Sequence, residues 1–253
     1  MIKSITSGNH PLVKHLVKLR QNRDYRYEHQ SLLIEGIKPV EELGRHNRFK
    51  LIVTYNEAMI PLGAEAAEIL IVNDAVMKKV SGMQSPEGLV VEIAMPAPAP
   101  LEGLKHILAL DGVSDPGNVG AMLRSALALG WEGVFVLNES CDPFNDKALR
   151  AARGATFRLP LAWGSLEQLK ELVKSNKLTP VVADINGNEL TKVAEGDSKA
   201  VLLVMGNEAH GPSQEIKDFC QAVTIAMPGS MESLNVSVAA GIMMYALRPR
   251  NSA

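Results

Sequence analysis

Residues 200–211 read Ala-Val-Leu-Leu-Val-Met-Gly-Asn-Glu-Ala-His-Gly, an apolar run followed by a polar loop. A short run without a polar break predicts a strand buried on both faces, which is typical of a parallel sheet covered by helices. Gly206 and Gly211 allow the loop to turn tightly enough to wrap a flat ligand such as a purine. Glu208, if buried, would need a partner. His210 has no Ser, Cys or acidic triad partner beside it in the sequence, so we interpret it as a solvent-facing loop residue.

The same alternation of apolar runs and helical spacing extends on both sides of this stretch. Further strands are predicted at 106–110, 133–137, 179–183 and 222–226, and helices at 119–129, 146–153, 166–175, 213–220 and 234–247. Strands that alternate with helices predict an α/β fold with a mostly parallel sheet and helices on both faces. Ligands bind such sheets outside the carboxyl ends of the strands. The last predicted helix is apolar nearly all round, which core packing or a dimer interface would explain equally well.

Two more polar loops follow predicted strands in this region. Residues 111–118 end in Asp-Pro-Gly-Asn, a turn for which Asn118 is the predicted helix cap. Arg124 lies within two turns of this helix start, although an arginine in such a place is more often simply exposed. The other loop passes through Ser233 and Asn235 into the last helix. Neither Gly-x-Gly-x-x-Gly after a strand nor Gly-x-x-x-x-Gly-Lys-Ser/Thr occurs, which argues against dinucleotide enzymes and P-loop ATPases.

A smaller α/β domain is predicted ahead of this region. Residues 94–100 read Ala-Met-Pro-Ala-Pro-Ala-Pro, and the alternating prolines predict an extended linker. We therefore predict domains at 1–93 and 102–253, joined by a linker at 94–101. Within the first domain, strands are predicted at 32–34, 51–54, 69–72 and 89–93, and helices at 9–21 and 36–46.

The charge of the chain is distributed unevenly. The first 50 residues hold ten Lys and Arg against five Asp and Glu, whereas the chain as a whole has 26 against 28. Any attraction to nucleic-acid phosphate should therefore come from the N-terminal region, although a solvated basic helix without function would look the same. The basic residues that we predict to contact nucleic-acid phosphates are Lys14, Lys18, Arg20, Arg23 and Arg26.

Composition sets further limits on the protein class. With 46% hydrophobic residues the chain can bury a sizeable core. Cys141 and Cys220 lie far apart with no Cys or His at metal-ligand spacing, so we expect neither a metal site nor a disulfide framework. No signal segment and no membrane-spanning segment is evident, and a reducing cytoplasm is the expected location.

The three polar loops, in their order and spacing, resemble the three motifs of the SpoU/TrmH branch of the SPOUT methyltransferases. In this chain they read DPGNVGAMLRSALALG (115–130), LLVMGNEAHG (202–211) and IAMPGSMESLNVSVAAGIMMYAL (225–247). The front stretch ITSGNHPLVKHLVKLRQNRDYRYEHQSLLIEG (5–36) more loosely resembles the substrate-binding domain of several ribosomal RNA methyltransferases. One departure is Ala226, which stands where the family usually has proline before the methionine.

This resemblance implies a catalytic domain with a deep trefoil knot, S-adenosylmethionine held in the knotted loops, and a homodimer in which both subunits build the site. The catalytic residues that it implies are Asn118, Arg124, Glu208, Ser233 and Asn235. The cofactor-binding residues that it implies are Met205, Gly206, Asn207, Met227, Leu234 and Asn235.

The activity that the resemblance implies is methylation of a ribose 2′-hydroxyl in RNA, by attack of the 2′-oxygen on the sulfonium methyl carbon. The family assigns proton removal to Arg124, but a guanidinium is effectively always protonated, so a literal base is physically demanding. Arg124 could instead hold an RNA phosphate and stabilise the developing alkoxide. Ribosomal RNA is the preferred substrate, and transfer RNA is the alternative. The rival functions are a non-catalytic RNA-binding or ribosome-assembly factor with the same fold, and a small-molecule α/β enzyme.

Overall fold

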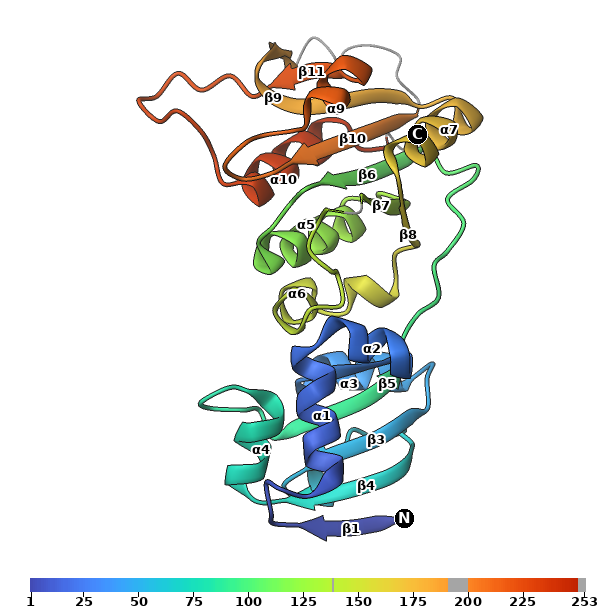
Figure 1. The fold of residues 1–253 in the computed structure, drawn as a ribbon, viewed down its shortest axis with the longest axis vertical. Helices are drawn as coiled ribbons and strands as arrows, with labels where there is room; N and C mark the ends of the chain where they lie inside the picture. The colour runs from blue at the N-terminus through green and yellow to red at the C-terminus, as the bar shows by residue number, and fades with distance from the viewer. Residues whose placement is uncertain (138, 191–199, 250–253) are drawn as a thin grey trace. The chain divides into compact units, whose positions relative to one another are not determined.

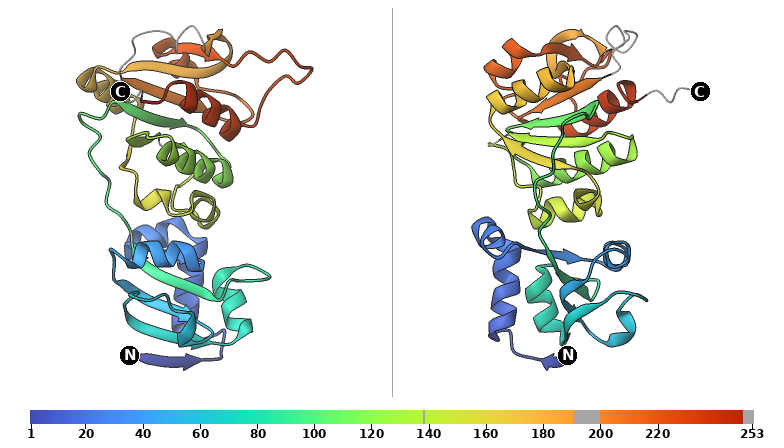
Figure 2. Two further views of the ribbon diagram at one scale, coloured as in Figure 1. Left: turned by 180° about the vertical axis from the view of Figure 1, so that it is seen from behind. Right: turned by 90° about the vertical axis from the view of Figure 1, so that its right-hand side faces the viewer.

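The computed structural model describes residues 1–137, 139–190 and 200–249, and these residues form two compact units (Figures 1 and 2). The first unit consists of Met1–Ala97 together with Phe144–Gly154, and the second of Pro98–Pro143 together with Ala155–Ala253. The chain therefore passes between the units three times. No helix among the described residues has the length and apolar character needed to cross a membrane.

The first unit is built on a five-stranded mixed sheet with the order β1-β4-β3-β5-β2. β1, β4 and β3 run parallel to one another, while β5 runs antiparallel to both β3 and β2. The strands are β1 (Ile2–Ile5), β2 (Ser31–Glu35), β3 (Phe49–Thr54), β4 (Ala66–Val72) and β5 (Leu89–Ala94).

The helices of the first unit include one from a distant part of the sequence. They are α1 (Pro11–Gln21), α2 (Arg23–His29), α3 (Ile37–Gly44), the 3-10 turn η1 (Glu57–Met59), α4 (Asp74–Ser81) and α6 (Asp146–Ala152). α6 lies between two strands of the second unit in sequence, yet it packs against β2, the edge strand of the first sheet. Ala148, Leu149 and Ala152 of α6 are buried. An edge strand exposes unpaired backbone groups, and a covering helix is one of the ways in which proteins protect it.

The second unit contains a six-stranded sheet in the order β11-β9-β10-β6-β7-β8, in which every neighbouring pair is parallel. The predicted parallel α/β fold is confirmed. Its strands are β6 (His106–Asp111), β7 (Gly133–Leu137), β8 (Leu161–Gly164), β9 (Thr179–Glu189), β10 (Val201–Gly206) and β11 (Gln221–Thr224). The trefoil knot that the family resemblance implies stays a prediction.

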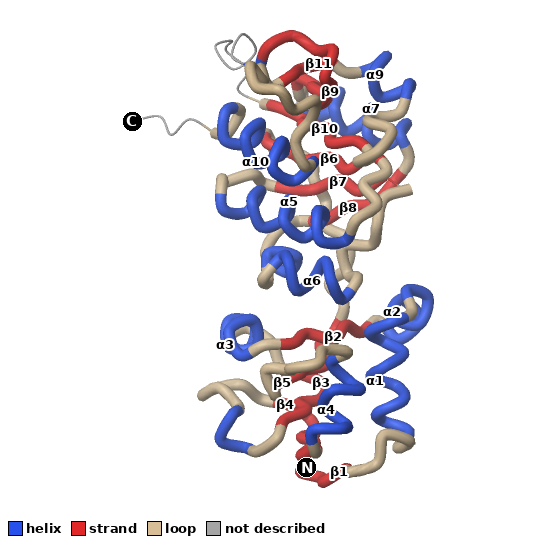
Figure 3. Tube along the Cα trace, turned by 90° about the vertical axis from the view of Figure 1, so that its left-hand side faces the viewer, coloured by secondary structure: helices blue, strands red, loops and turns tan. Residues whose placement is uncertain are grey.

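Helices cover both faces of this sheet, as Figure 3 shows: α5 and α10 lie on one face, and α7 and α9 on the other. The helices are α5 (Pro116–Ala128), the 3-10 turn η2 (Ala155–Phe157), α7 (Leu166–Asn176), α9 (Gln214–Phe219) and α10 (Val236–Ala246). β10 is fully buried, as its unbroken apolar run predicts. From β6 the chain adds β7 and then β8 on one side of the sheet. It then crosses to the other side, where β9 is followed by β10, which lies between β9 and β6. β6 and β10 therefore form the switch point at which such sheets bind ligands.

The structure corrects one predicted helix cap. Asp115, not Asn118, caps α5: its carboxylate accepts a hydrogen bond from the Asn118 backbone N–H at 2.9 Å, and Pro116 occupies the first turn. Proline is favoured there because its fixed φ suits the helix and its missing N–H would have had no helical partner. The helix thus starts three residues earlier than predicted, which leaves the Asn118 side chain available for other contacts.

Candidate active site

The loops that follow β6 and β10 are tied to each other at their first residues. The two strands are paired in register up to Gly206 and Asp111. The Asn207 side chain donates a hydrogen bond to the Gly112 carbonyl at 2.8 Å, and Asp111 accepts one from the Ser213 backbone N–H at 2.7 Å. Parallel pairing therefore places two of the predicted polar loops side by side, and side-chain hydrogen bonds fix their relative position.

Glu208, in the loop after β10, binds the loop after β6 through both of its carboxylate oxygens. Oε2 accepts hydrogen bonds from the Ser114 N–H at 3.0 Å and from its hydroxyl at 2.8 Å. Oε1 accepts from the Asp115 N–H and from the Asn118 side-chain amide, both at 3.0 Å. Partial burial pushes the pKa of Glu208 upward, but the hydrogen bonds from Asn118, Ser114 and Asp115 outweigh it and lower the pKa to about 2. Glu208 is therefore a saturated, ionised anchor rather than a proton acceptor.

The third loop joins through Asn235. Its side-chain amide donates to the Asn118 Oδ1 atom at 3.1 Å. The Asn235 Oδ1 atom caps α10, accepting hydrogen bonds from the Ser237 and Val238 backbone N–H groups at 2.9 and 3.3 Å. Asn118, Glu208 and Asn235, which we call the loop network, thus connect the starts of α5 and α10 with the loop after β10, although Asn118 is 90 residues from Glu208 and 117 from Asn235 in the sequence.

Gly206 lies where β10 meets its loop, and the backbone returns close to it. A Cβ atom on Gly206 would lie 2.2 Å from the Pro212 nitrogen and 2.6 Å from the Gly211 carbonyl carbon. Both are backbone atoms, so no side-chain movement could make room. Glycine is the residue that allows this close approach, as the sequence pattern predicted.

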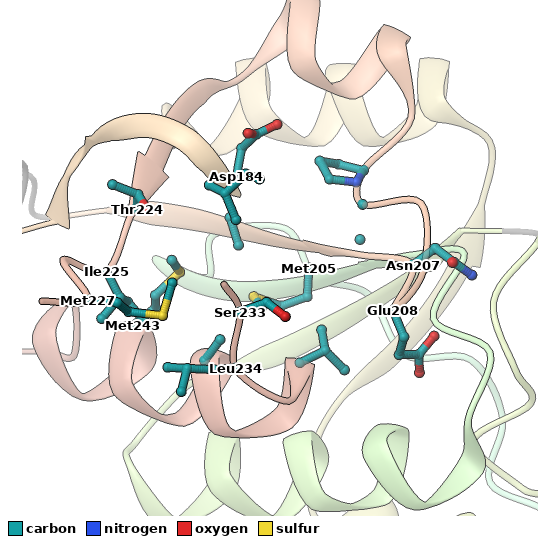
Figure 4. A pocket seen from close by; sticks show the side chains of 17 residues that line it. Asp184, Met205, Asn207, Glu208, Thr224, Ile225, Met227, Ser233, Leu234 and Met243 are labelled. Atoms are coloured by element: carbon teal, nitrogen blue, oxygen red, sulfur yellow. The ribbon is translucent and has the colours of Figure 1, made fainter. Parts of the chain in front are cut away.

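A cavity of about 700 Å³, part of it open to solvent, lies beside these loops. Figure 4 shows Met205, Ser233 and Leu234 near its middle, with Glu208 at one end and Met227 at the other. Apolar side chains line most of it, with a few polar groups at its edges, as is common in sites for small ligands. The lining residues predicted from the sequence are Met205, Gly206, Asn207, Glu208, Met227, Ser233 and Leu234.

The remaining predicted site residues lie outside the cavity lining. Asn118 and Asn235 belong to the loop network. Arg124 is exposed on α5, and within the described residues its guanidinium has no hydrogen-bond or ion-pair partner. The structure thus brings Asn118, Glu208 and Asn235 together and leaves Arg124 free.

The five basic residues predicted to contact RNA have different surroundings. Lys14 and Lys18 are exposed on α1, and Arg23 is exposed at the start of α2. Arg26 is only 3% exposed and donates hydrogen bonds to the Leu19 and Arg20 carbonyls at 3.1 and 3.2 Å. Arg20 donates to the Val80 carbonyl at 3.0 Å. Arg26 has almost no surface to offer a phosphate, because it is used to fix α2 against α1.

Sequence reasoning missed two contributors to the site. Ser114 donates twice to Glu208, and only the fold could show that it faces this residue. Asp184 lines the cavity from an outward bulge of β9, where the pairing with β11 jumps from Val182 to Asn188. Its ion pair with Lys217 at 2.8 Å lowers the pKa of Asp184. The one signal for the bulge was Gly187, where a Cβ would meet the β11 backbone at 2.5 Å.

Comparison with known proteins agrees with this geometry. Residues 105–245, more than half of the chain, match the SpoU rRNA Methylase family. The chain belongs to the SpoU rRNA methylase family. All three loops of the site fall within this match. Residues 10–91 separately match the MRM3-like substrate binding domain, which covers most of the first unit.

Individual SpoU relatives extend the similarity over the whole chain. The 23S rRNA (guanosine(2553)-2′-O)-methyltransferase RlmP of Bacillus subtilis is 30% identical over 98% of this chain and all of its own length. The 23S rRNA (adenosine(1067)-2′-O)-methyltransferase of Streptomyces laurentii is 35% identical over 60% of this chain and 58% of its own. An AdoMet-bound rRNA methyltransferase from Sinorhizobium meliloti has a TM-score of 0.84 and 29% identity, covering 97% of each chain.

Proposed function

We propose that this protein transfers the methyl group of S-adenosylmethionine to a ribose 2′-hydroxyl of ribosomal RNA. The observation that carries the proposal is the loop network, which joins three strand-end loops beside one cavity in a member of the SpoU family. Ribosomal RNA is favoured because the Bacillus subtilis relative, similar over its whole length, is named for 23S rRNA. Transfer RNA is the second candidate, since a Synechocystis relative 30% identical over 98% of the chain carries the name tRNA/rRNA methyltransferase.

The cavity suits S-adenosylmethionine, which has a flat apolar base, ribose hydroxyls and a charged amino-acid end. Met205, Met227 and Leu234 offer apolar surface, and Gly206 allows the loop to close tightly beside it. Asn207, whose side chain bridges two loops, completes the set that would hold the cofactor. When bound, the cofactor supplies an electrophilic methyl group. What remains for the protein is to align the 2′-oxygen and to stabilise charge as its proton leaves.

The side chains of the site divide this work. Glu208 has a pKa of about 2 and four hydrogen-bond donors, so it holds the loops in place and does not accept the proton. The Arg124 guanidinium has no partner among the described side chains, and as a planar fork it can bind a phosphate of the RNA and stabilise the developing alkoxide. The proton then passes to phosphate or solvent. Asn118 and Asn235 position the two helix starts, and Ser233, which lines the cavity, would orient the substrate sugar.

A homodimer is part of the proposal. Along one side of α10, Val238, Ile242 and Tyr245 are 51%, 41% and 58% exposed, at a spacing that places them on one face of the helix. An apolar stripe of this kind is typical of a surface that another subunit covers. Ile242→Glu should convert the dimer to a monomer in sedimentation experiments, and a wild-type protein that sediments as a monomer at micromolar concentration would contradict the proposal.

Radiolabelled methyl transfer tests the function. Purified protein is incubated with labelled S-adenosylmethionine and, separately, ribosomal RNA, transfer RNA, protein extract and small metabolites. We expect label in ribosomal RNA, recovered as alkali-resistant dinucleotides because a 2′-O-methyl group blocks cleavage at that ribose. Label in transfer RNA would select the second candidate. Binding of RNA without transfer to any fraction would identify a non-catalytic assembly factor and overturn the proposal.

A further inference from the structure

Three aromatic rings from α1 and α2 meet on the surface of the first unit. The Tyr25 ring lies 5.6 Å from His15 and 4.0 Å from His29, centroid to centroid, and the two imidazoles are 5.3 Å apart. The Lys18 ammonium lies 4.9 Å from the Tyr25 ring centre. We call His15, Lys18, Tyr25 and His29 the ring patch. Rings are scarce in this protein, which has 4% aromatic residues and four tyrosines in all, so their concentration in one short helix is informative.

The members of the ring patch have different tasks. His15 is held from both sides: its Nδ1 atom is 2.9 Å from the Tyr25 hydroxyl, and its Nε2 atom is 3.4 Å from the carboxylate of the buried Glu92. These contacts fix the orientation of the Tyr25 ring. His29, by contrast, is exposed, and within the described residues its ring nitrogens have no hydrogen-bond partner. The patch thus consists of two rings held in place, His15 and Tyr25, and an exposed ring, His29, that is free to contact a ligand.

Further cations lie on the elements that carry the ring patch or contact its backbone. Lys14 and Lys18 are one helical turn apart on the exposed side of α1. Lys50 donates to the His29 carbonyl at 3.4 Å and to the Gln30 carbonyl at 3.3 Å, so its ammonium is held beside the patch. Proteins commonly hold unpaired nucleotides with exposed aromatic rings and nearby cations. The bases stack on the rings, and the cations bind the phosphates of the nucleic-acid backbone.

We infer that the ring patch is a docking site for an unpaired base of the RNA substrate, with His29 and Tyr25 as the stacking surface and Lys14 and Lys18 on the flanking phosphates. The inference rests on the proposed function, because it gives the matched substrate-binding domain a specific task. Stacking tolerates any base, since every base has a flat face, so this site supplies affinity and placement while sequence selection lies elsewhere.

The test compares two oligomers with the same number of phosphates. Fluorescence anisotropy measures binding of the full-length protein to a labelled twelve-nucleotide oligoadenylate and to an abasic ribose-phosphate oligomer of equal length. We expect wild type to prefer the oligoadenylate, and His29→Ala to weaken that binding about fivefold or more and to remove the preference, on the scale of one lost stacked base. His29→Phe, which keeps a ring, should retain the preference, whereas Lys18→Ala should weaken binding of both oligomers.

The controls separate failure of the inference from failure of the function. His46→Ala removes another exposed histidine of the same unit, two residues after the end of α3, and should behave as wild type. Methyl transfer to ribosomal RNA is measured in parallel. Equal binding of both oligomers by wild type, or no effect of His29→Ala in a protein that still methylates RNA, would overturn the ring patch alone. If the full-length protein bound another protein through the ring patch more tightly than it binds oligoadenylate, the patch would be a protein-binding surface. That result would also overturn the inference.

Discussion

The loop network and the ring patch use polar side chains in opposite ways. In the loop network, Glu208 accepts four hydrogen bonds, and Asn118 and Asn235 are bonded to each other and to the chain around them. In and around the ring patch, His29 and the lysines of α1 remain exposed. A site for a small ligand is assembled before the ligand binds, so the polar groups of the site are already paired. A large, charged ligand needs groups that are still free.

Arg124 is the residue that breaks this division, since it lies in the second unit but has no hydrogen-bond or ion-pair partner among the residues that the structure describes, and it gives the largest expected effect. Arg124→Ala should lower kcat for methyl transfer at least about 10²- to 10³-fold, the range seen when one charge-stabilising donor is lost. Cofactor affinity should be unchanged, because Arg124 lies outside the cavity lining. Calorimetric titration with S-adenosylmethionine measures the cofactor affinity. A large loss of that affinity would show that Arg124 helps to build the cofactor site instead.

Gly206→Ala tests whether the cofactor site depends on the close approach of the 211–212 backbone to Gly206. The new Cβ would lie 2.2 Å from the Pro212 nitrogen, so the loop at 207–212 must move. Overpacking of this kind costs about 1–3 kcal/mol, and we expect cofactor affinity to fall about 10- to 100-fold as that cost converts to binding. The matched control is Gly229→Ala, in the loop after β11, where a Cβ would meet nothing within 4 Å. Equal effects of both variants on cofactor affinity would contradict a role for the close backbone approach at Gly206.

Glu208→Gln tests the saturated anchor itself. The new amide would replace one carboxylate oxygen with an NH2 group, which would face the N–H donors of either Ser114 or Asp115. The loops should therefore separate and cofactor affinity should fall about tenfold, the cost of roughly one lost charged hydrogen bond. Glu171→Gln, on the exposed surface of α7, is the control.

The pH dependence of stability gives a second readout. The folded pKa of about 2 lies below the ordinary value of 4.5, so the stabilisation from Glu208 is complete above pH 4.5 and is lost as the pH falls toward 2. The difference in urea midpoint between wild type and Glu208→Gln should therefore be constant from pH 6 to 9 and shrink below pH 4.5. A difference that changes near neutral pH would show that Glu208 titrates there.

The smallest effect distinguishes the free cations from the buried one. Lys14→Ala should lower RNA affinity a few-fold and reduce the slope of log K against log salt by about 0.7 to 0.9. Arg26→Ala should leave that slope unchanged but lower the free energy of unfolding by about 1–3 kcal/mol, because two carbonyls lose their buried donor. Chemical denaturation and salt titrations of binding measure both, and a reduced slope for Arg26→Ala would show that it reaches the RNA after all.

Sequence reasoning worked where strand periodicity determines position. The parallel sheet and the polar loop after β10 could be predicted, because strand ends in a parallel sheet meet at one edge. The cavity-lining residues Met205, Met227 and Leu234 came instead from the resemblance of their loops to the SpoU/TrmH motifs. Residue contacts between loops could not. Ser114 reaches Glu208 only because Asp115 starts α5 one turn before the predicted cap.

The first unit was harder to predict for two physical reasons. α2 is short and rich in charge, so it has no apolar periodicity, and β1 has only four residues. The burial of Arg26 depends on the turn that Asn22 makes between α1 and α2, where it ends one helix and caps the next. Spacing along one helix carries no information about that turn, so five basic residues looked equivalent when they are not.

The origin of α6 has a consequence for how the protein is made. The N-terminal 97 residues leave the ribosome well before residues 144–154, which cover the edge strand β2. During synthesis the first sheet therefore has to wait, with that edge open, until residues 98–143 of the second unit have also been translated. Completion of the first unit is in this way delayed until the chain is committed to building the second.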